Sequence, residues 1–147
     1  MAYNILQKRA AETAKVELVQ GDGAPLLDDD GNVLTVTIYG PGSKRWQQAD
    51  AERSRKRTQR IEKNRGRISA ALEGSTEDEI DFLVAITVSF DGWEYPAPAN
   101  DDGTPGAFAS PRDQFRAAYA DDAIGFIRDH VHKEGTNWSA FTQGSKG

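Results

Sequence analysis

The two histidines of this sequence, His130 and His132, stand two residues apart near the end of an apolar stretch. Imidazole is a common metal ligand and the usual general base at neutral pH. Residues two apart on a helix point to different sides, however, so the two rings would not easily share a metal ion. Asp129 and Glu134 are the only acids beside them. The pattern favours solvated histidines near a helix C-terminus over a metal site.

Two further stretches resemble ligand-binding loops but have the wrong spacing. DDDGN, residues 28–32, begins like a calcium loop, yet Val33 and Tyr39 stand where the turn glycine and the bidentate glutamate belong. We therefore expect a turn there. GPGS, residues 40–43, lacks the spacing of a phosphate-binding loop and indicates a strand-to-helix turn.

Catalytic residues are not apparent either. No G-x-S-x-G nucleophile elbow occurs, and neither histidine has a partner that could relay a proton. We expect no catalytic, cofactor or metal site, and a protein that is not an enzyme.

The composition bounds the class of protein. The chain has 147 residues, an apolar fraction of 37% and a charged fraction of 28%, which suits one ordinary domain with a modest core. It contains no cysteine, which excludes thiolate chemistry and is usual for a cytosolic chain. No apolar run reaches the roughly 18 residues that span a bilayer, and the first residues hold no signal-peptide core. We expect no membrane contact.

Charge is unevenly distributed along the chain. Residues 43–67 hold ten Lys or Arg and three acids, a net +7, whereas the remainder holds eight basic and twenty acidic side chains, a net −12. Such a basic segment indicates an electrostatic contact with a partner. Nucleic acid is disfavoured, because no aromatic residue between Trp46 and Phe82 can stack on bases. An acidic protein and a second copy of this chain fit the charge split equally well.

The elements that would position these residues fall into three parts: residues 1–42, 43–74 and 75–147. The first part contains KVELVQ and the β-branched run VLTVTIYG on either side of the DDDGN turn. We expect residues 16–39 to form a hairpin or a three-stranded meander, after a short N-terminal helix. The predicted fold class is α+β, a small N-terminal antiparallel β unit followed by a mainly helical domain with a long basic helix.

The second part is that long basic helix, which should begin after the capping residue Ser43. Between Gln47 and Arg60 it has no apolar residue larger than alanine. Burial of a helix normally needs an apolar stripe, so we expect this half of the helix to project from the fold.

The third part should begin with a helix. TEDE, residues 76–79, fits a capping box. IDFLVAITVSF, residues 80–90, alternates like a strand but also has helical apolar faces. The capping box and the length favour a helix, whereas the β-branched residues favour a strand, and we take the helix as the prediction.

A Pro/Gly-rich loop, residues 93–109, should follow where Asp91-Gly92 ends this helix. Trp93 is expected to fold back onto Phe90 and Ile86 and to fix the point where the loop leaves. Beyond the loop, Ser110-Pro111 is expected to cap a short helix, and a longer helix and an aromatic turn follow.

Six residues are candidates for partner binding. The three arginines share one face of the basic helix, and the three aromatic residues stand in polar surroundings, where such side chains often anchor a partner. For each aromatic residue, packing in the core is the stronger interpretation. The six are Trp46, Arg53, Arg57, Arg60, Trp138 and Phe141.

The order of motifs in the second half resembles that of the tail assembly chaperones encoded by long-tailed bacteriophages. Those proteins show Gly-Trp after an apolar helix, a loop with a pre-helical Ser or Pro, and a closing helix near a final Phe. The β unit with its D-G turn is also similar. The long basic helix and the extended loop depart from the family pattern. The matching positions are Gly92, Trp93, Ser110, Pro111, Ile127, Val131 and Phe141, to which we assign structural roles.

The resemblance implies a non-enzymatic protein of the host cytoplasm. Such a chaperone binds the tape measure protein while tail tube subunits assemble, and it is absent from the mature virion. One alternative is a structural virion protein of the tail or neck. A second, weaker alternative is a basic-helix nucleic-acid-binding regulator, because residues 47–60 lack the apolar core of a helix-turn-helix.

Overall fold

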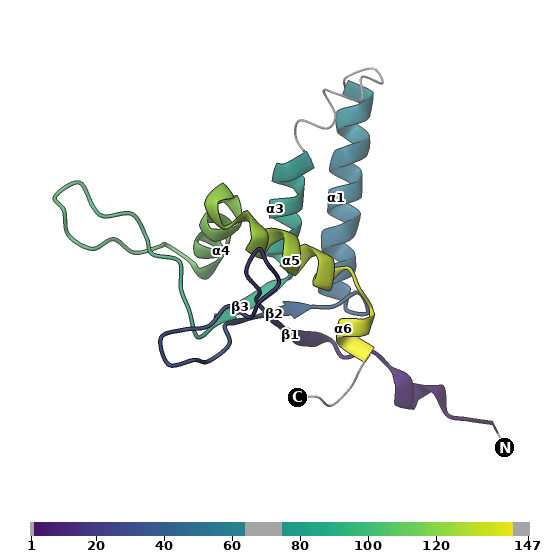
Figure 1. Cartoon of the computed structure of the whole chain (residues 1–147). Helices are drawn as coiled ribbons and strands as arrows, with labels where there is room; N and C mark the ends of the chain where they lie inside the picture. The colour runs from purple at the N-terminus through teal and green to yellow at the C-terminus, as the bar shows by residue number, and fades with distance from the viewer. Residues whose placement is uncertain (1, 64–74, 143–147) are drawn as a thin grey trace.

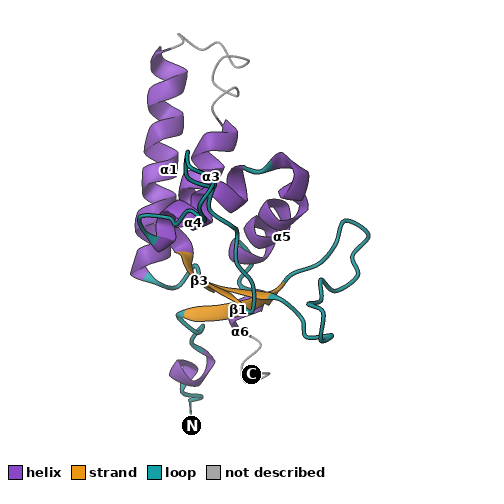
Figure 2. Ribbon diagram, turned by 90° about the vertical axis from the view of Figure 1, so that its left-hand side faces the viewer, coloured by secondary structure: helices purple, strands orange, loops and turns teal. Residues whose placement is uncertain are grey.

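The computed structural model describes residues 2–63 and 75–142, in which a three-stranded antiparallel sheet lies on one side of a group of helices (Figures 1 and 2). The predicted α+β class is confirmed. The strands are β1 (Thr13–Glu17), β2 (Thr35–Tyr39) and β3 (Thr87–Asp91), with β2 in the middle. The helices are α1 (Lys44–Lys63), α3 (Ser75–Ile86), α4 (Pro111–Ala120) and α5 (Gly125–Gly135), and the shorter turns are η1 (Ile5–Lys8), η2 (Asp122–Ile124) and α6 (Ser139–Thr142).

The sheet has one apolar and one polar face, as alternation in an antiparallel sheet requires. Val16, Val36 and Ile38 are buried beneath the helices. On the other face, Asp91 of β3 accepts hydrogen bonds from Thr35 Oγ1 at 3.2 Å and Thr37 Oγ1 at 2.7 Å. Burial raises the pKa of Asp91, but these hydroxyls and that of Ser89 outweigh burial and hold the pKa below its ordinary value. The carboxylate thereby joins β3 to β2.

The connection from β1 to β2 folds as two short hairpins, in agreement with the predicted meander. Backbone hydrogen bonds run from the N–H of Leu18 to the carbonyl of Leu34, and from Leu26 and Leu34 to the carbonyls of Leu18 and Leu26. The DDDGN turn is confirmed: the Asp28 carboxylate accepts from the N–H groups of residues 30 and 32, and Gly31 has φ +84°.

The segment from residue 80 to residue 90 corrects the sequence prediction of one helix. Helix α3 ends at Ile86 and β3 begins at Thr87, with no residue between them. The Thr87 hydroxyl donates to the carbonyl of Leu83 at 2.6 Å, within the last turn of α3. Residues 87–91 pair with β2 instead. β-branched side chains favour a strand over further turns of helix. The sheet therefore takes its third strand from the part of the chain that was expected to be entirely helical.

Helix α3 is at the centre of the core. Its residues Phe82, Leu83 and Ile86 are buried in the cluster that includes the apolar face of the sheet. Helices α4 and α5 complete the cluster with Tyr119 and Val131, both fully buried. Because Thr87 uses its hydroxyl proton on Leu83, the Tyr119 hydroxyl donates to Thr87 Oγ1 at 2.8 Å, and no polar atom of this pair is left without a partner.

The expected helix caps are partly confirmed. The N–H of Trp46 donates to Ser43 Oγ at 3.2 Å, and Ser110 accepts from the N–H of Asp113 at the start of α4. Helix α3, in contrast, begins at Ser75, so Thr76 lies inside the helix that it was expected to cap. Residues 64–74, which were expected to complete the basic helix, lie outside the described residues. None of the described helices is long and apolar enough to cross a membrane.

Candidate functional site

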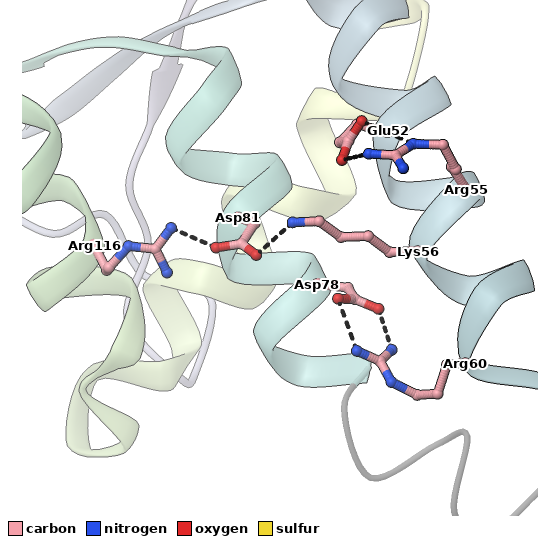
Figure 3. A network of polar contacts seen from close by, with 7 residues as sticks. All are labelled: Glu52, Arg55, Lys56, Arg60, Asp78, Asp81 and Arg116. Carbon is pink, nitrogen blue, oxygen red and sulfur yellow. Dashed lines mark hydrogen bonds and ion pairs between the residues drawn. The ribbon is translucent and has the colours of Figure 1, made fainter. Parts of the chain in front are cut away.

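Basic side chains of α1 contact acidic side chains of α3. Residues 47–60 of α1 therefore do not project from the fold as predicted. Helices α1 and α3 run side by side (Figures 1 and 2), and the contact between them is shown in Figure 3. Arg60 contacts both carboxylate oxygens of Asp78. Lys56 donates to Asp81 at 3.0 Å, and Arg116 of α4 contacts the other oxygen of Asp81. We call these five residues the charged seam.

Asp81 is the hub of the charged seam, because it joins three helices. Burial raises its pKa, but the hydrogen bonds and charges of Lys56 and Arg116 outweigh burial and lower the pKa below the ordinary value. The carboxylate is therefore ionised at neutral pH. Two bases of residues 43–67, Lys56 and Arg60, are thus paired with acids of α3, which leaves fewer positive charges for a partner than the sequence suggested.

Arg53 of α1 also contacts α3, but beside Phe82 and His132 and not within the charged seam. Its guanidinium carbon lies 3.8 Å from the centre of the Phe82 ring, and its Nη1 lies 2.9 Å from His132 Nε2. A guanidinium can only donate, so Nε2 accepts and the neutral ring carries its proton on Nδ1, which faces Glu79 at 3.7 Å.

This placement corrects the expectation of solvated histidines. His132 is partly buried against Phe82, with ring centres 6.2 Å apart. Burial lowers the pKa of His132; the charge of Arg53 adds to that effect, and the charges of Glu79 and Asp129 oppose it. His130 instead lies with Nε2 2.9 Å from the carbonyl of Glu17. Among the described residues, no group of three or more His, Asp or Glu side chains gathers as a metal ion would require.

The structure separates the six candidate partner-binding residues. Arg53 and Arg60 are engaged within the chain, and Arg57 alone of the three arginines is exposed. The Trp46 indole donates to the carbonyl of Gly135 at 2.8 Å and packs edge-on against Phe82. Phe141 is buried, and a methyl group added at Gly40 would lie within 2.7 Å of its ring. Trp138 is 53% exposed. Arg57 and Trp138 are the two that remain available at the surface.

The Pro/Gly-rich loop forms a projecting arm, residues 94–110, on the side of the molecule opposite α1 (Figure 1). At its start, Gly92 has φ +85°, and Trp93 stacks on Phe90 with ring centres 4.0 Å apart. The predicted contact of Trp93 with Phe90 is confirmed, and the indole also donates to the carbonyl of Thr35 at 2.9 Å. At the far end, Ser110 caps α4. Both ends of the arm are therefore fixed to the core.

The two legs of the arm enclose a hollow of about 620 Å³. Its tip is a turn at residues 100–104, in which the N–H of Asn100 donates to the carbonyl of Thr104 and Gly103 has φ +84°. The lining is mixed: it includes Tyr95, Pro96, Ala97, Pro105, Phe108 and Pro111 together with the polar residues Glu94, Ser110 and Gln114. Sequence reasoning treated this loop as a connection only, because the hollow depends on how the two legs lie against each other.

A second exposed feature is the N-terminal segment, residues 2–9, which extends away from the sheet (Figure 1). Its large apolar side chains are open to solvent: Tyr3 is 62% exposed, Ile5 69% and Leu6 62%. Sequence reasoning predicted a short helix here but no role for it. The signal that could have identified it is the combination of three large apolar residues with two bases and no acid before Glu12.

Comparison of the chain with protein-family models, with curated proteins and with solved structures finds no match in any of the three.

Proposed function

We propose that this chain is a non-enzymatic tail assembly chaperone of a long-tailed bacteriophage. In this proposal it binds the tape measure protein in the host cytoplasm while tail tube subunits assemble, and it is released before the virion is complete.

The observation that carries the proposal is the position of the residues through which the chain resembles that family. Gly92 and Trp93 lie at the start of the arm, and Ser110 and Pro111 lie at its end. The other three residues are buried where α5 and α6 pack on the sheet: Ile127, Val131 and Phe141. The residues shared with the family therefore lie at the two ends of the arm and in the core beside it, while the extended arm itself is particular to this chain and is a feature suited to protein binding.

The exposed apolar surface supports the same proposal. A protein that shields an aggregation-prone partner needs apolar side chains at its own surface, and single exposed residues are ordinary while clustered ones indicate a contact. The hollow of the arm and the N-terminal segment are two such clusters. Polar residues flank both clusters, so the contact with the partner can be released when the partner binds the tail tube subunits instead.

Co-expression with the tape measure protein tests the proposal. We expect this chain to increase the soluble fraction of the tape measure protein, and Tyr95→Asp/Phe108→Asp, which places charge in the hollow, to abolish that effect. Asp29→Lys/Asp30→Lys, in an exposed turn far along the chain from the arm, is the control and should behave as the unaltered chain does. A tape measure protein that stays insoluble in every case contradicts the proposal.

Mass spectrometry of purified particles separates this function from the structural alternative. We expect little or none of the chain in mature virions. Stoichiometric presence there would instead assign it to the tail or neck as a structural protein.

A further inference from the structure

The N-terminal segment is ordered although its apolar side chains are exposed. The Asn4 side chain accepts from the N–H of Leu6 at 3.1 Å, and the N–H of Arg9 donates to the carbonyl of Leu6 at 3.3 Å. The segment is joined to the body at Ala11, whose N–H donates to the carbonyl of Phe141 at 2.8 Å. One turn of 3-10 helix is thus held out from the fold with Tyr3, Ile5 and Leu6 at its surface.

The charges of this segment and of the arm are of opposite sign. The N-terminal segment carries Lys8 and Arg9, both exposed, and no acid. The arm carries Glu94, Asp101 and Asp102, all exposed, and no base. Each also has an apolar part: three side chains on the segment, and the hollow of about 620 Å³ on the arm.

The arm can bind the side chains of a partner in its hollow, but it cannot pair with an added β-strand. Pro96, Pro98 and Pro105 have no N–H, so neither leg offers the regular row of donors that strand addition requires. The legs also touch directly, since a methyl group at Gly106 would overlap the carbonyl oxygen of Pro98. The hollow is lined from both legs, by Tyr95 and Pro96 of the first and by Phe108 of the second.

We propose that the N-terminal segment of one copy of this chain docks in the arm of a second copy, with Ile5 and Leu6 in the hollow and Lys8 and Arg9 facing the acidic residues of the arm. The two surfaces cannot meet within one chain, because they lie on opposite sides of the molecule (Figure 1). The contact goes beyond the proposed function and does not depend on it.

Such a contact joins two different surfaces and is therefore heterologous. When one copy docks its segment in a second copy, its own arm can take the segment of that same copy, which closes a pair, or of a third copy, which builds a larger ring or an open series. The contact is small, which predicts weak association that depends on concentration and salt.

Sedimentation equilibrium of the purified full chain tests this proposal without any phage partner. At low salt, the average mass should rise with concentration above the 16.1 kDa of one copy. Ile5→Ser/Leu6→Ser and Lys8→Glu/Arg9→Glu in the segment, and Glu94→Lys/Asp101→Lys in the arm, should each weaken association by roughly tenfold or more. Asp29→Lys/Asp30→Lys makes the same change of charge elsewhere and should have no effect.

Recombining the variants gives the decisive result. A chain that carries both Lys8→Glu/Arg9→Glu and Glu94→Lys/Asp101→Lys should associate again, because both charges of the contact are reversed. An equimolar mixture of the Ile5→Ser/Leu6→Ser chain with the Glu94→Lys/Asp101→Lys chain should form pairs, through the one intact segment and the one intact arm. A wild-type chain that stays at 16.1 kDa up to about 1 mM, where even weak contacts are largely formed, overturns the proposal. Equal weakening by the Asp29→Lys/Asp30→Lys control also overturns it.

Discussion

The guanidinium of Arg53 lies over the ring of Phe82, with its central carbon 3.8 Å from the ring centre, where α1, α3 and α5 meet. This is how a helix surface without large apolar residues is packed against the core. The flat guanidinium covers one part of the ring while Trp46 meets it edge-on, with ring centres 5.5 Å apart. The polar half of α1 is therefore part of the fold and not an appendage.

The inward and outward arginines of α1 should differ in their effect on stability. Arg60→Glu would set a second negative charge against Asp78, whose side chain is only 8% exposed. We expect its thermal midpoint to fall by about 4 to 8 °C. Arg57→Glu, on the exposed face of the same helix, should change the midpoint by less than about 2 °C. Calorimetry of the two variants makes the comparison, and equal shifts would mean that the charged seam does not stabilise the fold.

Trp93 should anchor the start of the arm. Trp93→Ala removes the stacked contact with Phe90 and the hydrogen bond to Thr35, and should lower the free energy of unfolding by about 2 to 4 kcal/mol. Trp93→Phe keeps the stack and should lose about 1 kcal/mol. Trp138→Ala, at a 53% exposed tryptophan, is the control and should lose less than about 1 kcal/mol. Chemical denaturation measures all three, and a neutral Trp93→Ala would identify a binding residue instead of an anchor.

His132 should make the stability of the protein depend on pH near neutrality. Burial lowers the pKa of the folded ring below 6.5, so the unfolded chain takes up a proton at a pH where the folded chain does not. The free energy of unfolding should therefore fall as the pH is lowered from 7 through about 6.5, until the folded ring is also protonated. The lowered pKa values of Asp81 and Asp91 act only below about 4, where the stability they contribute is lost as the pH falls through their folded values.

Urea titrations at several pH values between 5 and 7.5 measure this dependence. His132→Gln should flatten it, whereas His130→Gln should leave it in place as the matched control. A dependence that persists unchanged in His132→Gln would assign it to another group.

The parts of the fold that depend on local pattern could be predicted from the sequence. The β-branched residues of VLTVTIYG predicted a strand, and β2 lies within that run. Ser110 before Pro111 located the start of α4. In each case one short stretch contains the whole physical cause, namely a run of β-branched side chains or a cap.

The parts that depend on two distant stretches could not be predicted. Lys56 and Arg60 look like a solvated surface until Asp81 and Asp78, on a separate helix, are placed beside them. The Trp46 indole finds its acceptor at Gly135, 89 residues along the chain. Residues 80–90 showed both a helical and a strand pattern of apolar residues, because the segment is a helix in its first part and a strand in its second. The boundary between the two depends on pairing with β2, which lies elsewhere in the sequence.

The direct passage from Ile86 of α3 to Thr87 of β3 has a mechanical consequence. No loop separates the two elements, but the pairing with β2 shifts register between Thr87 and Ser89, so that Val88 forms a bulge at the start of β3. One residue added or removed beyond this bulge would move the rest of β3 to the opposite face, and one added within α3 would turn the preceding part of the helix by about 100° and take Asp78 and Asp81 away from their cations. Since the arm starts where β3 ends, the bulge at Val88 lies on the direct backbone path from the arm to the interface of α3 with α1, and it can absorb a displacement of the arm before that displacement reaches the charged seam.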